Sequence, residues 1–154
     1  MIIQNPFMQI ALEEAEKALN VQEVPVGAVI VNRETQQIIT KSHNMVEDRK
    51  IPIYHAEILV LIDAAQKLNS KYLQNCDLYV TLEPCHLCAA AISMFRVGRL
   101  FYGASDPKGG AVTSMLNFFN SANCLFKPEI YSDIHADKSA KLMRDFFHSL
   151  RSHN

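Results

Sequence analysis

The stretch Thr81–Ala91 constrains this chain more than any other, because it places two cysteines three positions apart at a change of local structure. The preceding residues, Leu78–Leu82, are β-prone, and small apolar residues typical of a buried helix follow the cysteines. Cys85 and Cys88 are therefore expected where a strand passes into a helix N-terminus. Two thiolates in such a turn can hold one tetrahedral zinc ion, and the helix dipole favours the anionic form of a thiol there.

Two cysteines do not complete a metal site, and the best third ligand in the sequence is His55. A second C-x-x-C pair is absent from the sequence, which excludes a zinc ribbon. Three protein ligands leave the fourth zinc position open for water, as in catalytic zinc sites. Glu57 lies two residues beyond His55, near enough to exchange protons with that water. His-x-Glu followed by Pro-Cys-x-x-Cys is the signature of zinc nucleobase deaminases, which predicts one Zn²⁺ per chain.

Each part of this pattern has a simpler interpretation when it is taken alone. A single C-x-x-C can be a redox pair or two buried thiols, and a single histidine is usually structural. Because all the matched positions occur together and in order, we interpret them as one catalytic site. The other cysteines, Cys76 and Cys124, are expected to be buried apolar thiols and not a disulfide.

Length and charge limit the remaining possibilities. A chain of 154 residues is expected to form a single domain over residues 1–154. The net charge of −1 and the pI near 6.6 give no global signature of nucleic-acid binding, and we expect no DNA partner. No apolar run approaches the roughly 20 residues that span a membrane, and the N-terminus lacks a basic region followed by an apolar core. The expected location is therefore cytoplasmic, with no membrane partner.

Hydrophobic periodicity predicts alternating helices and strands along the chain. The expected helices cover residues 6–19, 56–68, 86 to about 95 and 136–150, with a short helix at 115–119; the expected strands cover 24–31, 37–42, 78–82, 100–103 and 128–133. Residues 43–54 are expected to be a loop. This order predicts an α/β protein, a three-layer α-β-α sandwich around a five-stranded mixed sheet, with parallel pairing among the last three strands.

Further strings lie outside the zinc motif: Glu23–Val29, Gly103–Ala111, and the Asp145-Phe146-Phe147 sequence near the C-terminus. With these strings the chain resembles the bacterial tRNA-specific adenosine deaminases, which have a cytidine deaminase-like fold. The resemblance covers nearly the whole chain. It implies hydrolysis of adenosine to inosine, with release of ammonia, at wobble position 34 of a tRNA anticodon.

The resemblance also implies a role for individual positions. His55, Cys85 and Cys88 would bind zinc, and Glu57 would carry protons. The substrate-binding residues would be Val26 in the wall of the base pocket, Asn44 hydrogen-bonded to the target base, and Asp106 and Lys108 in the loop that meets the anticodon stem-loop. The family works as a homodimer, and its C-terminal helix contributes to the RNA surface.

Two other functions compete with this one. A deaminase of a free base or nucleoside, such as guanine or cytosine, would share the metal signature, and the low basic charge favours it. The strings Gly103–Ala111 and Phe146-Phe147 favour tRNA. A non-catalytic zinc-binding partner subunit should have lost its proton carrier, whereas Glu57 is present.

Overall fold

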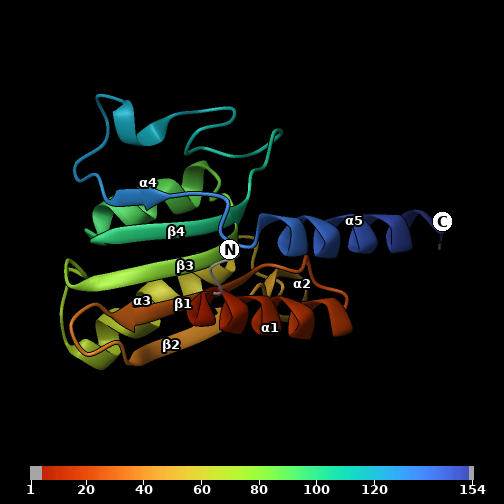
Figure 1. Cartoon of the computed structure of the whole chain (residues 1–154), viewed down its shortest axis with the longest axis horizontal. Helices are drawn as coiled ribbons and strands as arrows, with labels where there is room; N and C mark the ends of the chain where they lie inside the picture. Colours follow the sequence, from red (N-terminus) through yellow and green to blue (C-terminus); the bar gives the residue numbers. More distant parts are fainter. Residues whose placement is uncertain (1–4, 153–154) are drawn as a thin grey trace.

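A five-stranded mixed sheet forms the centre of the structure, a computed structural model that describes residues 5–152 (Figure 1). The strand order is β2-β1-β3-β4-β5. Strand β1 pairs antiparallel with β2 and β3, whereas the β3–β4 and β4–β5 pairs are parallel, as predicted. The strands are β1 (Gly27–Asn32), β2 (Ile38–His43), β3 (Cys76–Leu82), β4 (Arg99–Ala104) and β5 (Glu129–Tyr131).

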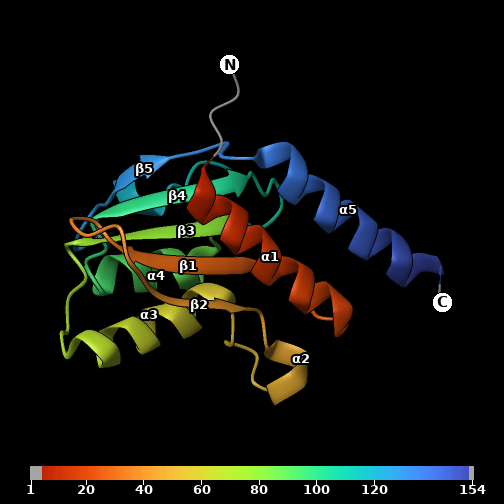
Figure 2. The same cartoon turned by 60° about the horizontal axis from the view of Figure 1, so that its bottom comes forward.

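Helices cover both faces of this sheet, which confirms the predicted three-layer sandwich. Helices α1 (Pro6–Asn20) and α5 (Ala136–Ser152) lie on one face, and α3 (Ala56–Leu68) and α4 (His86–Met94) lie on the other (Figure 2). Side chains alternate along each strand, so neighbouring residues serve different layers. In β1, Ile30 packs with residues of α3 and α4, whereas Val29 packs with α1.

The start of α1 and its close approach to β1 follow from local sequence. The side chain of Asn5 accepts hydrogen bonds from the N–H groups of Phe7 and Met8, and Pro6 occupies the first helical turn. A Cβ atom on Gly27 would overlap the backbone of α1 at Ala11. Only glycine therefore lets helix and strand pack this closely.

The expected loop at 43–54 contains a short helix, α2 (Val46–Arg49), so that part of the prediction was wrong. The backbone N–H of Asp48 donates to the carboxylate of Glu23, 2.6 Å away. A buried carboxylate from a distant segment thus binds a helix N–H that has no partner within its own turn. Lys50, with φ of 57°, ends the helix in the left-handed region.

The short helix expected at 115–119 was also wrong, because the structure has a 3-10 turn, η1, at Phe118–Asn120. The N–H groups of Met115 and Leu116 both donate to the carbonyl oxygen of Gly110. Ser114 is bound to Glu83. These contacts hold the segment as a loop and leave the apolar side chains of Met115 and Leu116 exposed.

The cysteines and the lengths of the helices were the subject of two further expectations. Each of the four cysteines, all of which lie within residues 5–152, is a free thiol; Cys76 is buried and Cys124 is half-buried. The prediction of a buried thiol is confirmed for Cys76 but was wrong for Cys124, whose Sγ donates to the carbonyl oxygen of Phe126 at 3.2 Å. Among the described residues, the helices are too short or too polar to cross a membrane.

Candidate metal centre

Two helix N-termini bring the predicted metal ligands together at the carboxyl end of β3. His55 is the residue before the first turn of α3, and Cys85 holds the same position at α4. Both have extended backbone conformations, and neither side chain caps its own helix. Cys88 follows one turn later and is fully buried. The helix dipoles thus favour anionic ligands at the same point, which is where α/β sheets usually place their sites.

The spacing of the three ligand atoms fits one tetrahedral zinc ion. Nδ1 of His55 lies 3.6 Å from Sγ of Cys85 and 3.4 Å from Sγ of Cys88. Zn–S bonds of about 2.3 Å and Zn–N bonds of about 2.0–2.1 Å place such atoms about 3.5–3.6 Å apart at tetrahedral angles. All three ligand atoms lie within 4.8 Å of one another. The residues therefore form a group that can hold a metal ion from three sides.

The protonation of this cluster also suits a cation. Hydrogen bonds from Cys88 and His55 lower the pKa of Cys85 to about 3, which makes it a thiolate. The same thiolate raises the pKa of His55 by hydrogen bonding and raises the pKa of Cys88. A bound metal cation replaces the protons that these atoms share, because coordinating thiols are deprotonated.

Glu57 lies beside the cluster, in the first turn of α3, with only 4% of its surface exposed. Burial raises its pKa to about 6. Its side chain lines the same cavity as His55 and Cys85. A carboxyl group with this pKa can both accept and donate a proton near neutral pH.

A cavity of about 370 Å³ opens over the cluster, a size in the range of small-molecule sites. Val26 and Asn44 both line it, as the resemblance implies. Oδ1 of Asn44 accepts the N–H of Ala56 at 2.8 Å, so the side chain is fixed by the start of α3. The side-chain oxygen of Asn44 is thereby bound within the protein, and the two N–H groups of its side-chain amide remain for a ligand.

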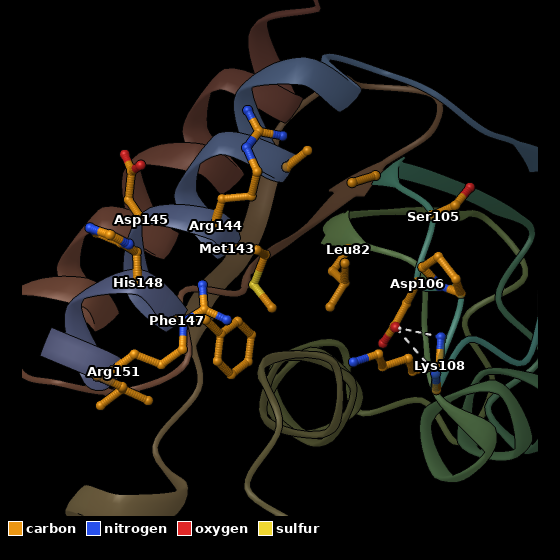
Figure 3. Close-up of a pocket in the computed structure, with 15 residues that line it drawn as sticks. Leu82, Ser105, Asp106, Lys108, Met143, Arg144, Asp145, Phe147, His148 and Arg151 are labelled. Carbon is orange, nitrogen blue, oxygen red and sulfur yellow. Dashed lines mark hydrogen bonds between the residues drawn. The ribbon is translucent and has the colours of Figure 1, made fainter. Parts of the chain in front are cut away.

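The other two predicted substrate-binding residues lie in a loop between this cavity and a larger one of about 1240 Å³. Asp106 lines both cavities, whereas Lys108 lines only the larger (Figure 3). Oδ1 of Asp106 accepts the N–H groups of Lys108 and Gly109, each at 3.1 Å. The Asp106 carboxylate therefore shapes its own turn, a role that the sequence analysis did not foresee.

The larger cavity runs along α5, and its lining includes the cations Lys108, Arg144 and Arg151 together with the anions Asp106 and Asp145. Arg144, His148 and Arg151 of α5 stand at its rim and are directed away from Lys108, whereas Phe147 points into the cavity (Figure 3). Met143 and Phe147 line both cavities and so connect them. The two neighbouring phenylalanines differ, because Phe146 is buried in the protein and Phe147 faces the cavities.

Sequence reasoning missed two buried carboxylates that line the smaller cavity, Glu23 and Glu83. Glu23 belongs to the string Glu23–Val29 and Glu83 to the metal motif Thr81–Ala91, but neither was assigned a role. The sequence does contain a signal for both, because each is an acidic residue next to an apolar strand. A carboxylate at such a position is buried only if it is hydrogen-bonded.

Comparison with known proteins identifies relatives over nearly the full chain. Residues 3–151 match the MafB19-like deaminase family. The tRNA-specific adenosine deaminase of Rickettsia bellii is 55% identical over 144 residues, which cover 94% of this chain and 99% of the relative. The enzyme of the same name from Aquifex aeolicus is 41% identical, with 95% of each chain covered.

Solved structures give the same result for the fold. A structure from a study of A-to-I editing by tRNA:A34 deaminases at the wobble position is 46% identical. Its TM-score is 0.85, and the match covers 88% of this chain and 97% of that chain. A guanine deaminase from Nitrosomonas europaea has a TM-score of 0.80 at 21% identity, covering 95% of this chain and 86% of that one, which shows a shared fold alone.

Proposed function

The chain belongs to the tRNA-specific adenosine deaminases, within the MafB19-like deaminases, and on that premise we propose that it converts adenosine 34 of a tRNA anticodon to inosine. The observation that carries this proposal is the group His55, Cys85 and Cys88 beside the buried Glu57, inside a cavity that borders a larger groove along α5. The reaction consumes one water and releases one ammonia.

His55, Cys85 and Cys88 would hold one zinc ion per chain. When bound by three protein ligands, zinc supplies an acidified water at neutral pH. Every further step depends on side chains of the protein. The helix N-termini and the fixed ligand spacing support this assignment, since they orient all three donors before a metal arrives.

Glu57 would move the protons. It takes a proton from the attacking water and delivers it to N1 of the purine, which makes C6 more electrophilic. After the C–O bond forms at C6, the carboxylate takes the remaining proton of that oxygen and passes it to the amino group. The C–N bond then breaks to release ammonia and leaves the carbonyl oxygen of inosine at C6. Burial of Glu57 in the cavity supports this role, because proton transfer requires the carboxyl group within reach of both water and base.

Asn44 and Val26 would hold the flipped base. The free amide N–H groups of Asn44 can donate to an acceptor such as purine N7. Val26 presents an apolar wall on which the ring can pack, and its carbonyl oxygen accepts the backbone N–H of Asn44 at 3.1 Å. This backbone hydrogen bond fixes the positions of Val26 and Asn44 relative to each other, which favours one orientation of the base.

The groove along α5 would receive the neighbouring nucleotides. Asp106 lines both cavities, and Lys108 extends across the larger one toward Phe147 of α5 (Figure 3). A single-stranded anticodon loop presents partly unstacked bases, so extruding one of them costs less than it would from a duplex. The groove supports an RNA substrate over a free base, which would fill only the smaller cavity.

One assay separates the proposed substrate from the free-base alternative. Guanine also carries N7, and the shared fold of a guanine deaminase makes it the natural competitor. We expect ammonia release from an anticodon stem-loop with adenosine at position 34, and little from free guanine, cytosine or adenosine. Efficient turnover of free guanine or cytosine with an unreacted stem-loop would favour the alternative.

We further propose that the protein acts as a homodimer in the cytoplasm, where its tRNA substrate is found. Exposed apolar side chains near the end of α4 support a contact between copies. Ser93 Oγ accepts the N–H of Leu125 at 3.2 Å, so the 82% exposed Leu125 lies beside α4, whose Met94 is 66% exposed. Apolar surface of this kind is a common feature of subunit contacts.

A further inference from the structure

Glu83 is a buried carboxylate whose hydrogen bonds all join it to one loop. It stands between the end of β3 and Cys85, and 2% of its surface is exposed. Its carboxylate accepts the hydroxyl of Ser114 and four backbone N–H groups at 2.9–3.1 Å, those of Asp106, Val112, Thr113 and Ser114. Buried charges persist when they are fully hydrogen-bonded, so this side chain forms a strong tie between sheet and loop.

The loop closes directly on the carboxylate. A Cβ atom on Gly110 would overlap the carboxyl group of Glu83. The φ angle of Gly110 is not positive, so the requirement at this position is for space and not for an unusual backbone conformation. The chain thus carries both the acceptor and the small residue that lets the loop fold around it.

The same tie reaches the residues that face the RNA groove. Glu83 Oε1 accepts the N–H of Asp106. Asp106 Oδ1 in turn accepts the N–H groups of Lys108 and Gly109 (Figure 3). Because Asp106 and Lys108 line the larger cavity, their placement depends on this chain of hydrogen bonds. Glu83 itself lines the smaller cavity next to Cys85, so it connects the two parts of the site.

We propose that Glu83 is a positioning residue, which fixes the loop 105–114 so that Asp106 and Lys108 meet the RNA next to the target adenosine. This role rests on the proposed function. The carboxylate needs both oxygens as acceptors. In Glu83→Gln one oxygen becomes an amide that points its own hydrogens at backbone donors, which leaves buried N–H groups unpaired.

The matched control is Asp77→Asn. Asp77 is also a buried carboxylate of β3, 1% exposed, but it lies at the other end of the strand. It binds Nε and Nη2 of Arg99 at 2.7 and 2.6 Å, away from the loop. Both variants change one buried carboxylate to an amide, so a general loss of stability would affect them alike.

Two measurements on the zinc-loaded protein test the proposal. Hydrogen exchange of peptides from 105–114 should accelerate at least about 10-fold in Glu83→Gln and stay at the parental rate in Asp77→Asn. The KM for the anticodon stem-loop should rise about 10-fold or more in Glu83→Gln, with a smaller fall in kcat. Parental loop exchange in a folded Glu83→Gln protein, or equal acceleration in Asp77→Asn, would overturn the proposal.

Two further variants keep Glu83 and test the tie from the loop. Ser114→Ala removes the hydroxyl that donates to Glu83. Gly110→Ala adds a Cβ atom that displaces the loop from the carboxylate. If Glu83→Gln does not fold, accelerated loop exchange in these two supports the proposal, and unchanged exchange overturns it. A parent protein that leaves the stem-loop unreacted overturns the proposed function, whereas faster exchange with an unchanged KM overturns only the role of Glu83.

Discussion

Two residues of the smaller cavity show how their surroundings give two chemically identical carboxyl groups different pKa values. Glu57 and Glu83 line the same cavity and are almost equally buried. Burial raises the pKa of Glu57 to about 6. Burial also acts to raise the pKa of Glu83, but hydrogen bonds from Ser114, Thr113 and Asp106 outweigh it and hold this pKa below its ordinary value. One carboxyl group is thereby suited to proton transfer and the other to binding backbone donors.

The proposed proton carrier can be tested by Glu57→Gln, which keeps size and polarity but removes the acid and base. We expect the variant to fold and to retain zinc. Its kcat should fall by about 10²–10⁴-fold or more, because this range is the usual contribution of a general acid–base group. Single-turnover kinetics on the stem-loop measure the loss. Activity within about threefold of the parent would mean that another residue transfers the proton.

The ligand assignment predicts a clear division among the cysteines. Cys85→Ala, Cys88→Ala and His55→Ala should each lose the metal, because two remaining ligands hold zinc poorly. Cys76→Ala and Cys124→Ala are the matched controls and should retain one zinc per chain. Elemental analysis of the purified variants gives the metal content, and full zinc retention in Cys88→Ala would refute the assignment.

Among the elements, helix starts and the loops that follow strands place the site. Helices α3 and α4 contribute His55 and Cys85 from equivalent positions, and the loop after β4 contributes Asp106 and Lys108. On the opposite face of the sheet, α5 extends past the ends of the strands (Figure 1). Its Arg144 and Arg151 help to line the groove. The pocket is thus shared between both helical layers.

The loop after β4 yields a prediction about salt dependence. Lys108→Ala should weaken binding of the stem-loop and reduce the log–log salt slope by about 0.7–1, because one phosphate contact is lost. Zinc content should not change. Lys71→Ala, which removes a lysine near the opposite end of β3, is the control. An unchanged slope in Lys108→Ala would exclude this lysine from the RNA contact.

For the whole molecule, the sequence predicted the architecture better than the contacts between distant segments. Periodicity defined α3 at its observed bounds and the mixed sheet, since both depend on local patterns of burial. It failed where a remote carboxylate decides local structure. Glu23 stabilises α2 within an expected loop, and Glu83 holds Ser114 where a helix was expected to begin nearby. A local sequence pattern carries no information about a hydrogen bond between distant segments. The short helix α2 and the loop at Ser114 could therefore be found only from the structure.

The proposed assembly is tested by light scattering. A homodimer should show twice the 17.4 kDa mass of the chain. Leu125→Glu, which places a charge in the exposed apolar surface beside α4, should shift the equilibrium toward monomer. A monomer mass that does not change with concentration in the parent protein would refute the dimer.

The central claim is that this protein makes inosine at one position of one class of RNA, and mapping the product tests it most directly. The zinc-loaded protein is incubated with an anticodon stem-loop that carries adenosine at position 34 and also in its paired stem. Inosine is then located by sequencing. The account predicts inosine at position 34 and unchanged adenosines in the stem, with no product from Glu57→Gln. An unmodified position 34 in the presence of active zinc-loaded protein, or inosine spread over the stem, would contradict it.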